Sequence, residues 1–412
     1  MQTKRKRMRA VLMCLIVCLL CACGDIAAAP TPRPEPTPEI TPEPTPEPTP
    51  EPTPAPILLP DGREIPADAE ELDLSAMEAE QIEETIPLLS GFPSLRSVNL
   101  GEESEERAVP VELLCRLTEA CPDADIAYRF TFFGKKISTL DEKLDLNHIR
   151  MDDEGEAVRQ LLPCMKHCRY LDMDSCNVSS EAMARIRDEN PQMEVVWRIW
   201  FGTMLTVRTD VERILASEEW MKLNNLTTKD LKYCTKVRLL DIGHATYLSD
   251  HSFLEYMPDL EVAILGISSF NDLTPLQNCT KLEYLEFNEC RVKDLSPLAG
   301  LKNLKHLNCC ILGEVTGWEA LLELKQLERL WIGRYTILPE GAKEELIEAL
   351  PDTEINFTEP TGTLGTWRRN ADGSFVERYA ELREQFQYSN YDRTIAMPWN
   401  DPLYEPHPDP EA

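Results

Sequence analysis

The sequence predicts a mixed α/β solenoid, in which short units of one strand and one return segment stack along the chain. The pattern Leu-x-x-Leu-x-Leu recurs five times at spacings of 22 or 23 residues. A longer period of about 70 residues relates two parts of the first half of the chain. One such unit cannot bury its apolar side alone, so neighbouring units must stack and pair their strands in parallel. The five copies begin at Val237, Leu260, Leu282, Leu304 and Leu327.

Each short copy supplies a strand and then a tight turn. The clearest copy begins at Leu282 and closes through the letters DLSPL at residues 294–298, and the preceding copy closes through DLTPL at 272–276. Side chains alternate along a strand, so the leucines face the interior and the residues between them face outward. We therefore expect a parallel sheet on the concave face, with 3₁₀ or irregular returns on the convex face.

The first half of the chain is expected to contain longer units with true helices. Residues 122–134 read PDADIAYRFTFFG and residues 191–202 read PQMEVVWRIWFG, and their first prolines are 69 residues apart. Each stretch follows a helix-like segment, at 111–120 and 180–189, and residues 346–357 form a weaker third echo. We interpret residues 57–230 as long, irregular units and residues 231–357 as short units of one continuous solenoid.

The composition excludes one class of partner. The 412-residue chain carries 42 Lys and Arg against 72 Asp and Glu, which gives a net charge of −30. Such a surface repels phosphate backbones, so no nucleic-acid partner is expected. Hydrophobic residues make up 42% of the chain, enough to bury a core outside the proline-rich region.

The first 56 residues predict export and a stalk. A basic start precedes an apolar run at residues 10–22, which is the signature of a secretory signal. The run ends in LCACG at 20–24, which resembles the lipobox of bacterial lipoproteins. That resemblance implies a signal peptide at 1–22, cleavage before Cys23 and a lipid on Cys23; an ordinary signal with a chance cysteine is the alternative. Residues 23–56 then form a lipid-anchored stalk, which is proline-rich and extended from residue 30 onward.

The last segment, residues 358–412, leaves the repeat. Trp367 and Arg368 precede a turn at residues 372–373, after which Ser374 is placed to cap a short helix. We expect a C-terminal helical cap that shields the last open edge of the solenoid, followed by a tail. The apolar face of this helix would consist of Phe375, Tyr379, Leu382 and Phe386.

The five copies resemble the leucine-rich repeat family, in particular its short class of about 22 residues in bacterial surface proteins. With the lipobox, the acidic Pro-Thr stalk and the Trp-Arg end, the chain resembles leucine-rich repeat surface lipoproteins of gut Clostridia-like Firmicutes. This resemblance implies a leucine-rich repeat solenoid that is lipid-anchored to the cell membrane on its extracytoplasmic side, at the bacterial cell surface. It implies no catalytic residues, and no cofactor is expected.

Ten cysteines follow Cys23. Most replace core aliphatic residues of other copies, or stand at the ninth position of the repeat, so we expect buried free thiols. Disulfides between Cys115 and Cys121, or between Cys164 and Cys168, stay open as alternatives. The run at 164–168 offers Cys, His and Cys, but Cys168 should point inward and no second paired motif follows, so no metal site is predicted. The expected free thiols are Cys168, Cys176, Cys234, Cys279, Cys290 and Cys309.

The register also identifies the outward-facing side chains of the strands. Aromatic residues at these positions, flanked by polar groups, are typical interface anchors. Three carboxylates form an acidic row that could meet a basic partner, and the alternatives are a solvated face or cover by the cap or the return loops. The candidate ligand-binding residues are Tyr170, Asp172, Asp241, Tyr284, Glu286 and Trp331.

These observations favour a membrane-anchored interaction module that binds an unidentified protein or glycan ligand through the concave face. An alternative from another class is a structural envelope scaffold, which predicts self-association into concentration-dependent oligomers. A hydrolase that uses Asp241 and His244 is disfavoured, because no nucleophile or Gly-rich oxyanion turn lies nearby.

Overall fold

The computed structural model describes residues 55–202, 205–217, 222–360, 362, 365–386 and 388, all of which belong to one compact unit, 54–412. The predicted signal peptide, Cys23 and nearly all of the stalk lie outside the described residues. In the part that is described, no helix is long and apolar enough to cross a membrane.

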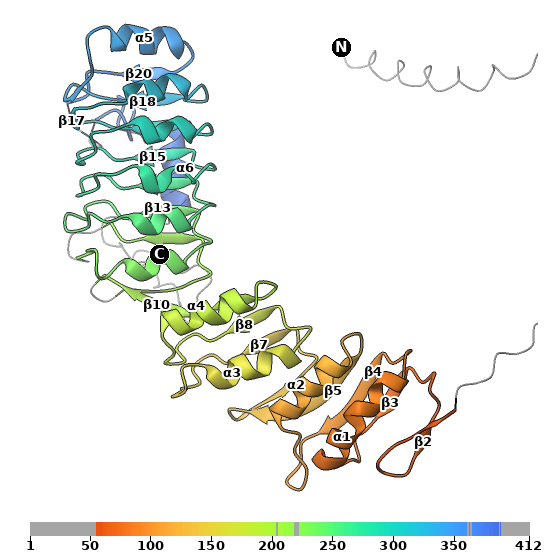
Figure 1. Ribbon diagram of the computed structural model, residues 1–412. Coiled ribbons are helices and arrows are strands. Elements are labelled where there is room, and N and C mark those ends of the chain that lie inside the picture. Colours follow the sequence, from red (N-terminus) through yellow and green to blue (C-terminus); the bar gives the residue numbers. More distant parts are fainter. Residues whose placement is uncertain are drawn as a thin grey trace, which may run out of the picture. The chain divides into compact units, whose positions relative to one another are not determined.

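A seven-stranded parallel sheet forms the second half of the unit (Figure 1). Five of its seven strands begin at the third position of the five predicted copies, and the register pairs Tyr284 with Val262 on one side and His306 on the other. The predicted repeat register is therefore confirmed. In spatial order the strands are β12 (Arg213–Leu215), β13 (Leu239–Asp241), β14 (Val262–Ile264), β15 (Tyr284–Glu286), β16 (His306–Asn308), β18 (Arg329–Trp331) and β20 (Glu354–Asn356).

The return segments behind this sheet are mostly 3₁₀ helices. In the two copies that close through Asp-Leu-Ser/Thr-Pro, the carboxylate accepts a hydrogen bond from the backbone N–H two residues on, at 2.9 Å for both Asp272 and Asp294. The proline that follows fixes φ for the first helical turn. The returns are η4 (Lys229–Tyr233), η5 (Ser252–Tyr256), η6 (Thr274–Leu276), η7 (Ser296–Gly300), η8 (Trp318–Glu323) and α5 (Ala342–Ala349), and a flanking pair of parallel strands is β17 (Gly313–Glu314) and β19 (Thr336–Ile337).

The first half contains true helices at the expected places. Helix α2 covers Val111–Ala120 and helix α4 covers Ser180–Glu189, where the Ser179 hydroxyl accepts a hydrogen bond from the Ala182 N–H at 3.2 Å. The remaining elements are α1 (Ala79–Thr85), η1 (Ile86–Gly91), α3 (Glu156–Leu161), η2 (Leu162–Cys164) and the hairpin of β1 (Ile57–Leu58) with β2 (Glu64–Ile65).

The strands that precede β12 form separate sheets and do not join the seven-stranded sheet. Two antiparallel hairpins, β5 with β6 and β10 with β11, interrupt the parallel order. The separate sheets are β3 (Glu71–Asp73), β4 (Ser97–Glu102), β5 (Asp125–Phe132) and β6 (Lys135–Ser138); β7 (Lys143–Asp145), β8 (Tyr170–Asp172) and β9 (Glu194–Val196); and β10 (Arg198–Phe201) with β11 (Leu205–Arg208).

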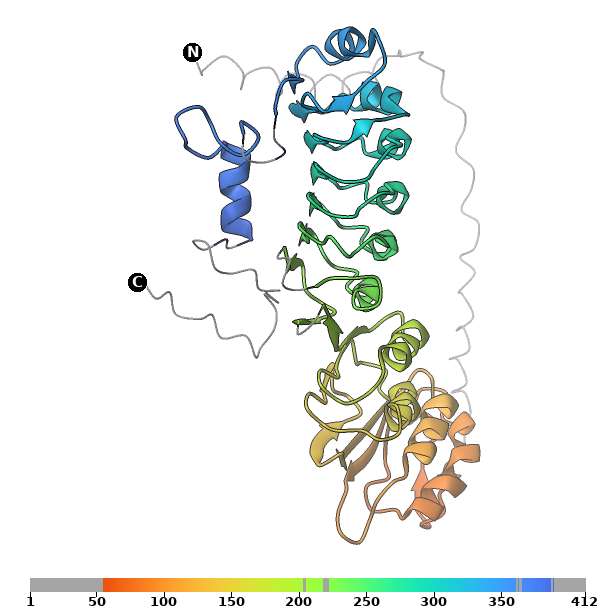
Figure 2. The ribbon, with the colours of Figure 1, turned by 90° about the vertical axis from the view of Figure 1, so that its left-hand side faces the viewer.

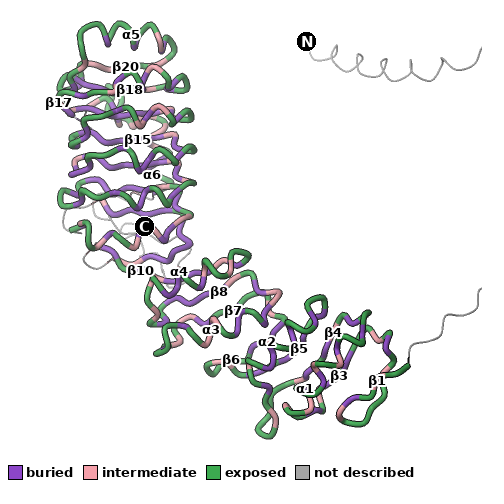
Figure 3. Tube along the Cα trace, in the orientation of Figure 1, coloured by how far each residue is buried: buried purple, intermediate pink, exposed green. Residues whose placement is uncertain are grey.

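One hydrophobic core nevertheless runs through all of these units. A single cluster of buried side chains extends from Leu59 to Leu350. In the seven-stranded sheet the middle residue of each short-repeat strand, such as Leu285 or Leu307, is fully buried in it. Figure 3 shows the same pattern as buried segments that recur along the stacked units. The coarse prediction of an α/β leucine-rich repeat solenoid is therefore confirmed.

The cysteines follow the predicted register with one exception. Cys115 of α2 and Cys164 of η2 form a disulfide, so both pairings considered from the sequence were wrong. Sequence proximity suggested those pairings, whereas the stacking of two successive units brings α2 against η2. The other eight described cysteines are free and buried, and they include all six of the expected free thiols. The eight are Cys121, Cys168, Cys176, Cys234, Cys279, Cys290, Cys309 and Cys310.

The C-terminal helix α6 (Glu377–Gln385) lies where the sequence did not place it. Figure 2 shows α6 on the side of the seven-stranded sheet opposite to the 3₁₀ returns. Its side chains contact the face of this sheet. We expected the helix to shield the last open edge of the solenoid, and these contacts do not show that role. Ser374 does not cap α6; Val376 occupies the N-cap, and the Ser374 hydroxyl donates to Asp372 at 2.6 Å.

A candidate binding face beneath a C-terminal strap

The candidate site lies on the face of the seven-stranded sheet that points away from the main core. We call it the strand face. Its side chains are the first and third residues of each strand, which alternate with the buried leucines. In the short repeats they are Leu239, Asp241, Val262, Ile264, Tyr284, Glu286, His306, Asn308, Arg329 and Trp331.

The strand face is covered by the chain's own C-terminal segment. We call residues 365–386, with Tyr388, the strap. Apolar side chains of the strap and the strand face form a second hydrophobic cluster, distinct from the main core. Our expectation that the candidate residues of this sheet form an exposed face was therefore wrong, and the alternative of cover by the C-terminal cap is what the structure shows. Their capacity to bind a ligand stays a prediction. The cluster includes Leu215, Val262, Ile264, Tyr284 and Trp331 from the sheet, and Trp367, Tyr379, Leu382 and Phe386 from the strap.

Glu286 is the polar centre of this contact. Its carboxylate is fully buried and accepts a hydrogen bond from the Trp367 indole N–H at 2.6 Å. The Arg368 guanidinium donates to both carboxylate oxygens, from Nε to Oε1 at 3.2 Å and from Nη2 to Oε2, and the Tyr284 hydroxyl donates as well. Burial opposes the charge of Arg368, but the Glu286 carboxylate raises the pKa of Arg368 well above its ordinary value. The strand face thus holds an indole and a guanidinium with one carboxylate.

The second anchor is a pair of tryptophans beside an arginine. The rings of Trp331 and Trp367 lie 5.4 Å apart, and both are buried. The Arg329 guanidinium lies 4.1 Å from the Trp331 ring centroid and 5.1 Å from that of Trp367. Arg329 also donates hydrogen bonds to the carbonyl oxygens of Trp367 at 2.9 Å and Thr366 at 3.0 Å. Arg329 of the sheet therefore binds the backbone of the strap as well as the Trp367 ring.

Asp241 forms the third contact with the strap. Its carboxylate accepts hydrogen bonds from the Tyr388 hydroxyl and, at 3.1 Å, from the Gly243 N–H. Burial raises the pKa of Asp241, and burial likewise raises that of Tyr388. The His244 side chain is exposed, and no hydrogen bond joins it to Asp241 in the described part of the chain. The hydrolase hypothesis gains no geometric support.

The structure places Tyr170 and Asp172 in a different sheet, on β8. Arg208 of β11, which is 2% exposed, donates to the Asp172 carboxylate at 2.9 Å and to the Tyr170 hydroxyl at 2.7 Å. Asp210 accepts from the same guanidinium at 3.1 Å. Burial opposes the charge of Arg208, but these carboxylates raise its pKa. Tyr170 and Asp172 are thus occupied by an internal arginine and do not join the strand face of the seven-stranded sheet.

Sequence reasoning identified the acidic row but not its partners. Asp172 meets Arg208, and Glu286 meets Arg368, so the basic groups that the row was expected to attract belong to the same chain. Arg208 was not identified from the sequence, because a single arginine in a strand carries no motif; the register did place Arg329 among the outward-facing side chains, but without a partner. The adjacent indole and guanidinium of Trp367 and Arg368 were a usable signal, since a carboxylate-and-aromatic face complements that pair.

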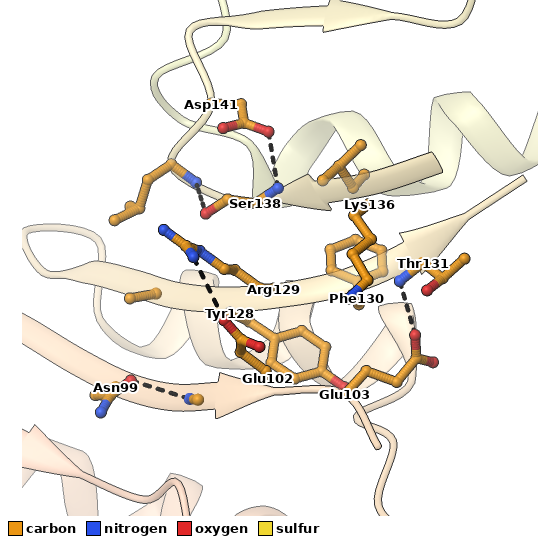
Figure 4. Close-up of a pocket in the computed structure, with 14 residues that line it drawn as sticks. Asn99, Glu102, Glu103, Tyr128, Arg129, Phe130, Thr131, Lys136, Ser138 and Asp141 are labelled. Atoms are coloured by element: carbon orange, nitrogen blue, oxygen red, sulfur yellow. Dashed lines mark hydrogen bonds and ion pairs between the residues drawn. The ribbon is translucent and has the colours of Figure 1, made fainter. Parts of the chain in front are cut away.

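A hollow on the N-terminal sheet lies away from the predicted sites (Figure 4). It encloses about 780 Å³ and is lined by residues of β4, β5 and β6 and of the turn after β6. Two of its carboxylates already have partners: Glu102 lies 3.3 Å from the Arg129 guanidinium, and Glu103 accepts from the Thr131 N–H at 2.7 Å. None of the carboxylates that line this hollow is buried as Glu286 is.

The Cys-rich run at 164–168 does not assemble ligands for a metal. Cys164 is in the disulfide, Cys168 is buried, and His167 Nε2 lies 2.7 Å from an Asp125 oxygen. Across the described ranges, no group of three or more His, Cys, Asp or Glu side chains is arranged to hold a metal ion.

Comparisons with known proteins give partial likenesses. No family model matches the chain. Cilia- and flagella-associated protein 410 of Mus musculus is 37% identical over 67 residues, which are 16% of this chain and 27% of that protein. An internalin of Listeria monocytogenes is 18% identical, with 71% of this chain and 68% of that chain covered and a TM-score of 0.31. A leucine-rich repeat protein of Leptospira interrogans is 15% identical, with 65% and 74% covered and a TM-score of 0.30. Likenesses of this degree assign neither a partner nor an activity to this chain.

Proposed function

We propose that the protein is a membrane-anchored, extracytoplasmic interaction module that binds a protein ligand through the strand face. One observation carries this proposal: the strand face buries a polypeptide segment, the strap, by means of three of the candidate residues, Tyr284, Glu286 and Trp331. A face that desolvates an indole and pairs a guanidinium has the chemistry of a protein-binding hot spot. The structure contains no comparable observation in favour of a glycan.

The anchor and the location in this proposal rest on the sequence. The basic and apolar start followed by LCACG supports a lipid on Cys23, and the proline-rich stretch supports display away from the membrane. Metabolic labelling of the full chain with an alkyne fatty acid tests the anchor. We expect label on the wild-type chain and none on the Cys23→Ala variant; equal labelling of both would contradict a lipid at this residue.

Selection of displayed random peptides on the immobilised full chain tests the binding face. We expect enriched peptides to bind at least tenfold more weakly to the Glu286→Gln variant, because hydrogen bonds to a charged group contribute roughly 1.5–3 kcal/mol each. The matched control is Glu319→Gln, which changes an exposed carboxylate on η8, behind the sheet. Cooperative unfolding of the wild type and of both variants shows that all three are folded. Equal binding of the peptides to these three proteins would then show that the ligand site lies elsewhere.

A self-assembling scaffold is the second candidate. The observation in its favour is β20, the last strand of the seven-stranded sheet, which pairs only with β18 among the described elements. An unpaired strand edge is a template for pairing with another chain. Sedimentation of the full chain over a hundredfold concentration range tests this candidate: concentration-dependent oligomers would support it, and a monomer throughout would count against it.

A further inference from the structure

We propose that the strand face is a recognition site for an external polypeptide segment that carries an indole side chain followed by a guanidinium, and that the strap is an internal competitor for this site. The inference rests on the proposed function and specifies the chemistry of the protein ligand. It also gives the strap a second role, because the strap must leave before such a ligand binds.

The chemistry of the ligand follows from three side chains of the strand face that contact the strap: Glu286, Trp331 and Arg329. The Glu286 carboxylate accepts from an indole N–H and a guanidinium at once, so it selects adjacent Trp and Arg side chains. Trp331 provides the aromatic wall of the indole pocket. Arg329 donates to two successive backbone carbonyls, which any polypeptide offers. Together these groups bind two side chains, the backbone carbonyl of the indole residue and the carbonyl of the residue before it.

The strap is separable from the fold that carries the site. Its apolar side chains belong to the second cluster, whereas the main core from Leu59 to Leu350 contains no strap residue. The one β-bridge of the described strap is internal, between Arg369 and Phe375, and none pairs the strap with the sheet. If the strap leaves, Glu286 and Asp241 return to water and do not stay buried without partners. Local opening of the strap therefore does not require opening of the core.

The strap also fills the site incompletely. Asn288 follows β15 on the same face, is fully buried, and neither its amide nitrogen nor its amide oxygen has a hydrogen-bond partner among the described residues. It lines a small cavity of about 90 Å³ between the sheet and the strap, together with Asp241, Glu286, Arg368 and Tyr388. An unpaired buried amide is costly, and the backbone of an extended segment could pair with both of its atoms. A ligand that reaches Asn288 thus gains hydrogen bonds that the strap does not make.

A synthetic peptide with the sequence of residues 365–388 is the probe for this proposal, labelled for fluorescence anisotropy. It is titrated into the wild-type full chain and into a full chain whose strap is weakened by Trp367→Ala and Arg368→Ala. We expect the weakened chain to bind at least tenfold more tightly, because an attached strap competes at an effective concentration in the millimolar range. Binding should fall at least tenfold when Glu286→Gln is added to the weakened chain, or when the Trp and the first Arg of the peptide are replaced by Ala.

Equal binding to the wild-type and weakened chains, or binding that ignores Glu286, would overturn the proposal. If the doubly substituted strap abolishes cooperative unfolding of the protein, Arg368→Gln alone serves as the weakened chain with the same criteria. Failure here is distinct from failure of the proposed function. Displayed peptides that depend on Glu286 but lack the Trp-Arg pair would refute only the ligand chemistry, whereas the absence of any Glu286-dependent peptide would refute both.

Discussion

At the scale of single residues, the buried charges are explained by their partners. Glu286 and Arg208 are both removed from water, and each is surrounded by groups of complementary charge or hydrogen-bonding capacity. A buried ion pair adds modestly to stability, but a lone buried charge is strongly unfavourable. The two sites differ in what happens when the contact breaks: the strap can withdraw from Glu286, whereas Arg208 belongs to a strand of the solenoid.

This difference predicts a large effect at Arg208. Replacing Arg208 with Ala leaves Asp172 and Asp210 close together without their shared cation, so we expect the free energy of unfolding to fall by about 3–5 kcal/mol. The control is Arg238→Ala, which removes an exposed pair with Glu261 and should cost less than about 1 kcal/mol. Urea unfolding of the full chains measures both. Similar losses for the two variants would mean that the Arg208 network is not a buried charge cluster.

A buried histidine predicts a dependence of stability on pH. His251 packs 4.7 Å from the Phe270 ring, neither ring nitrogen has a partner in the described structure, and burial lowers its pKa to about 4. The unfolded chain binds a proton near pH 6.5 that the folded chain resists until about pH 4, so the contribution is present above pH 6.5 and is lost as pH falls toward 4. His251→Phe should flatten the decline in unfolding free energy across this window. A decline identical to that of the wild type would contradict the assignment.

At the scale of elements, alternation along the chain was enough to place the short strands. The outward-facing residues Tyr284, His306 and Arg329 lie on the strands in the predicted register, because one face of each strand is fixed by buried leucines. The hairpins of the first half could not be anticipated in the same way. The turn between β5 and β6 has positive φ at both Phe133 and Gly134, which is the geometry of a type I′ turn. Such turns prefer Asn, Asp or Gly at the first of these positions, so Phe133 gave no sequence signal for it.

The position of the strap on the strand face was not predicted either. Its apolar spacing indicated one face of a helix, but Glu286 and Arg368 are 82 residues apart, and no local pattern connects them. The sequence therefore predicted the components of the candidate site, a row of carboxylates and aromatics, and offered cover by the cap only as an alternative to an open binding face.

The link between successive units gives a prediction about the disulfide. Because α2 stacks on η2, we expect a peptide map under non-reducing conditions to contain Cys115 joined to Cys164, and neither Cys115 with Cys121 nor Cys164 with Cys168. Replacing both bonded cysteines with Ala should lower the free energy of unfolding by about 2–4 kcal/mol, since the bond closes a long loop. The double change Cys279→Ala and Cys290→Ala, at buried free thiols, is the control for the map, which should stay unchanged.

At the scale of the whole molecule, one continuous core supports a surface that the chain itself occupies. The main cluster spans both halves, while the contacts between strap and strand face form a separate cluster. This division is what would let the solenoid stay folded if the strap opens, as we propose. We have proposed that the strand face binds polypeptide and that the strap competes for it.

Hydrogen exchange in the wild-type full chain tests this claim most directly. Amides of α6 are followed with and without an excess of the peptide of residues 365–388, and amides of β15 and β16 serve as the internal reference. We expect the peptide to accelerate exchange in α6 by roughly tenfold, because it traps the open state, and to leave exchange in the reference strands unchanged. Exchange in α6 that does not respond to saturating peptide would contradict the claim.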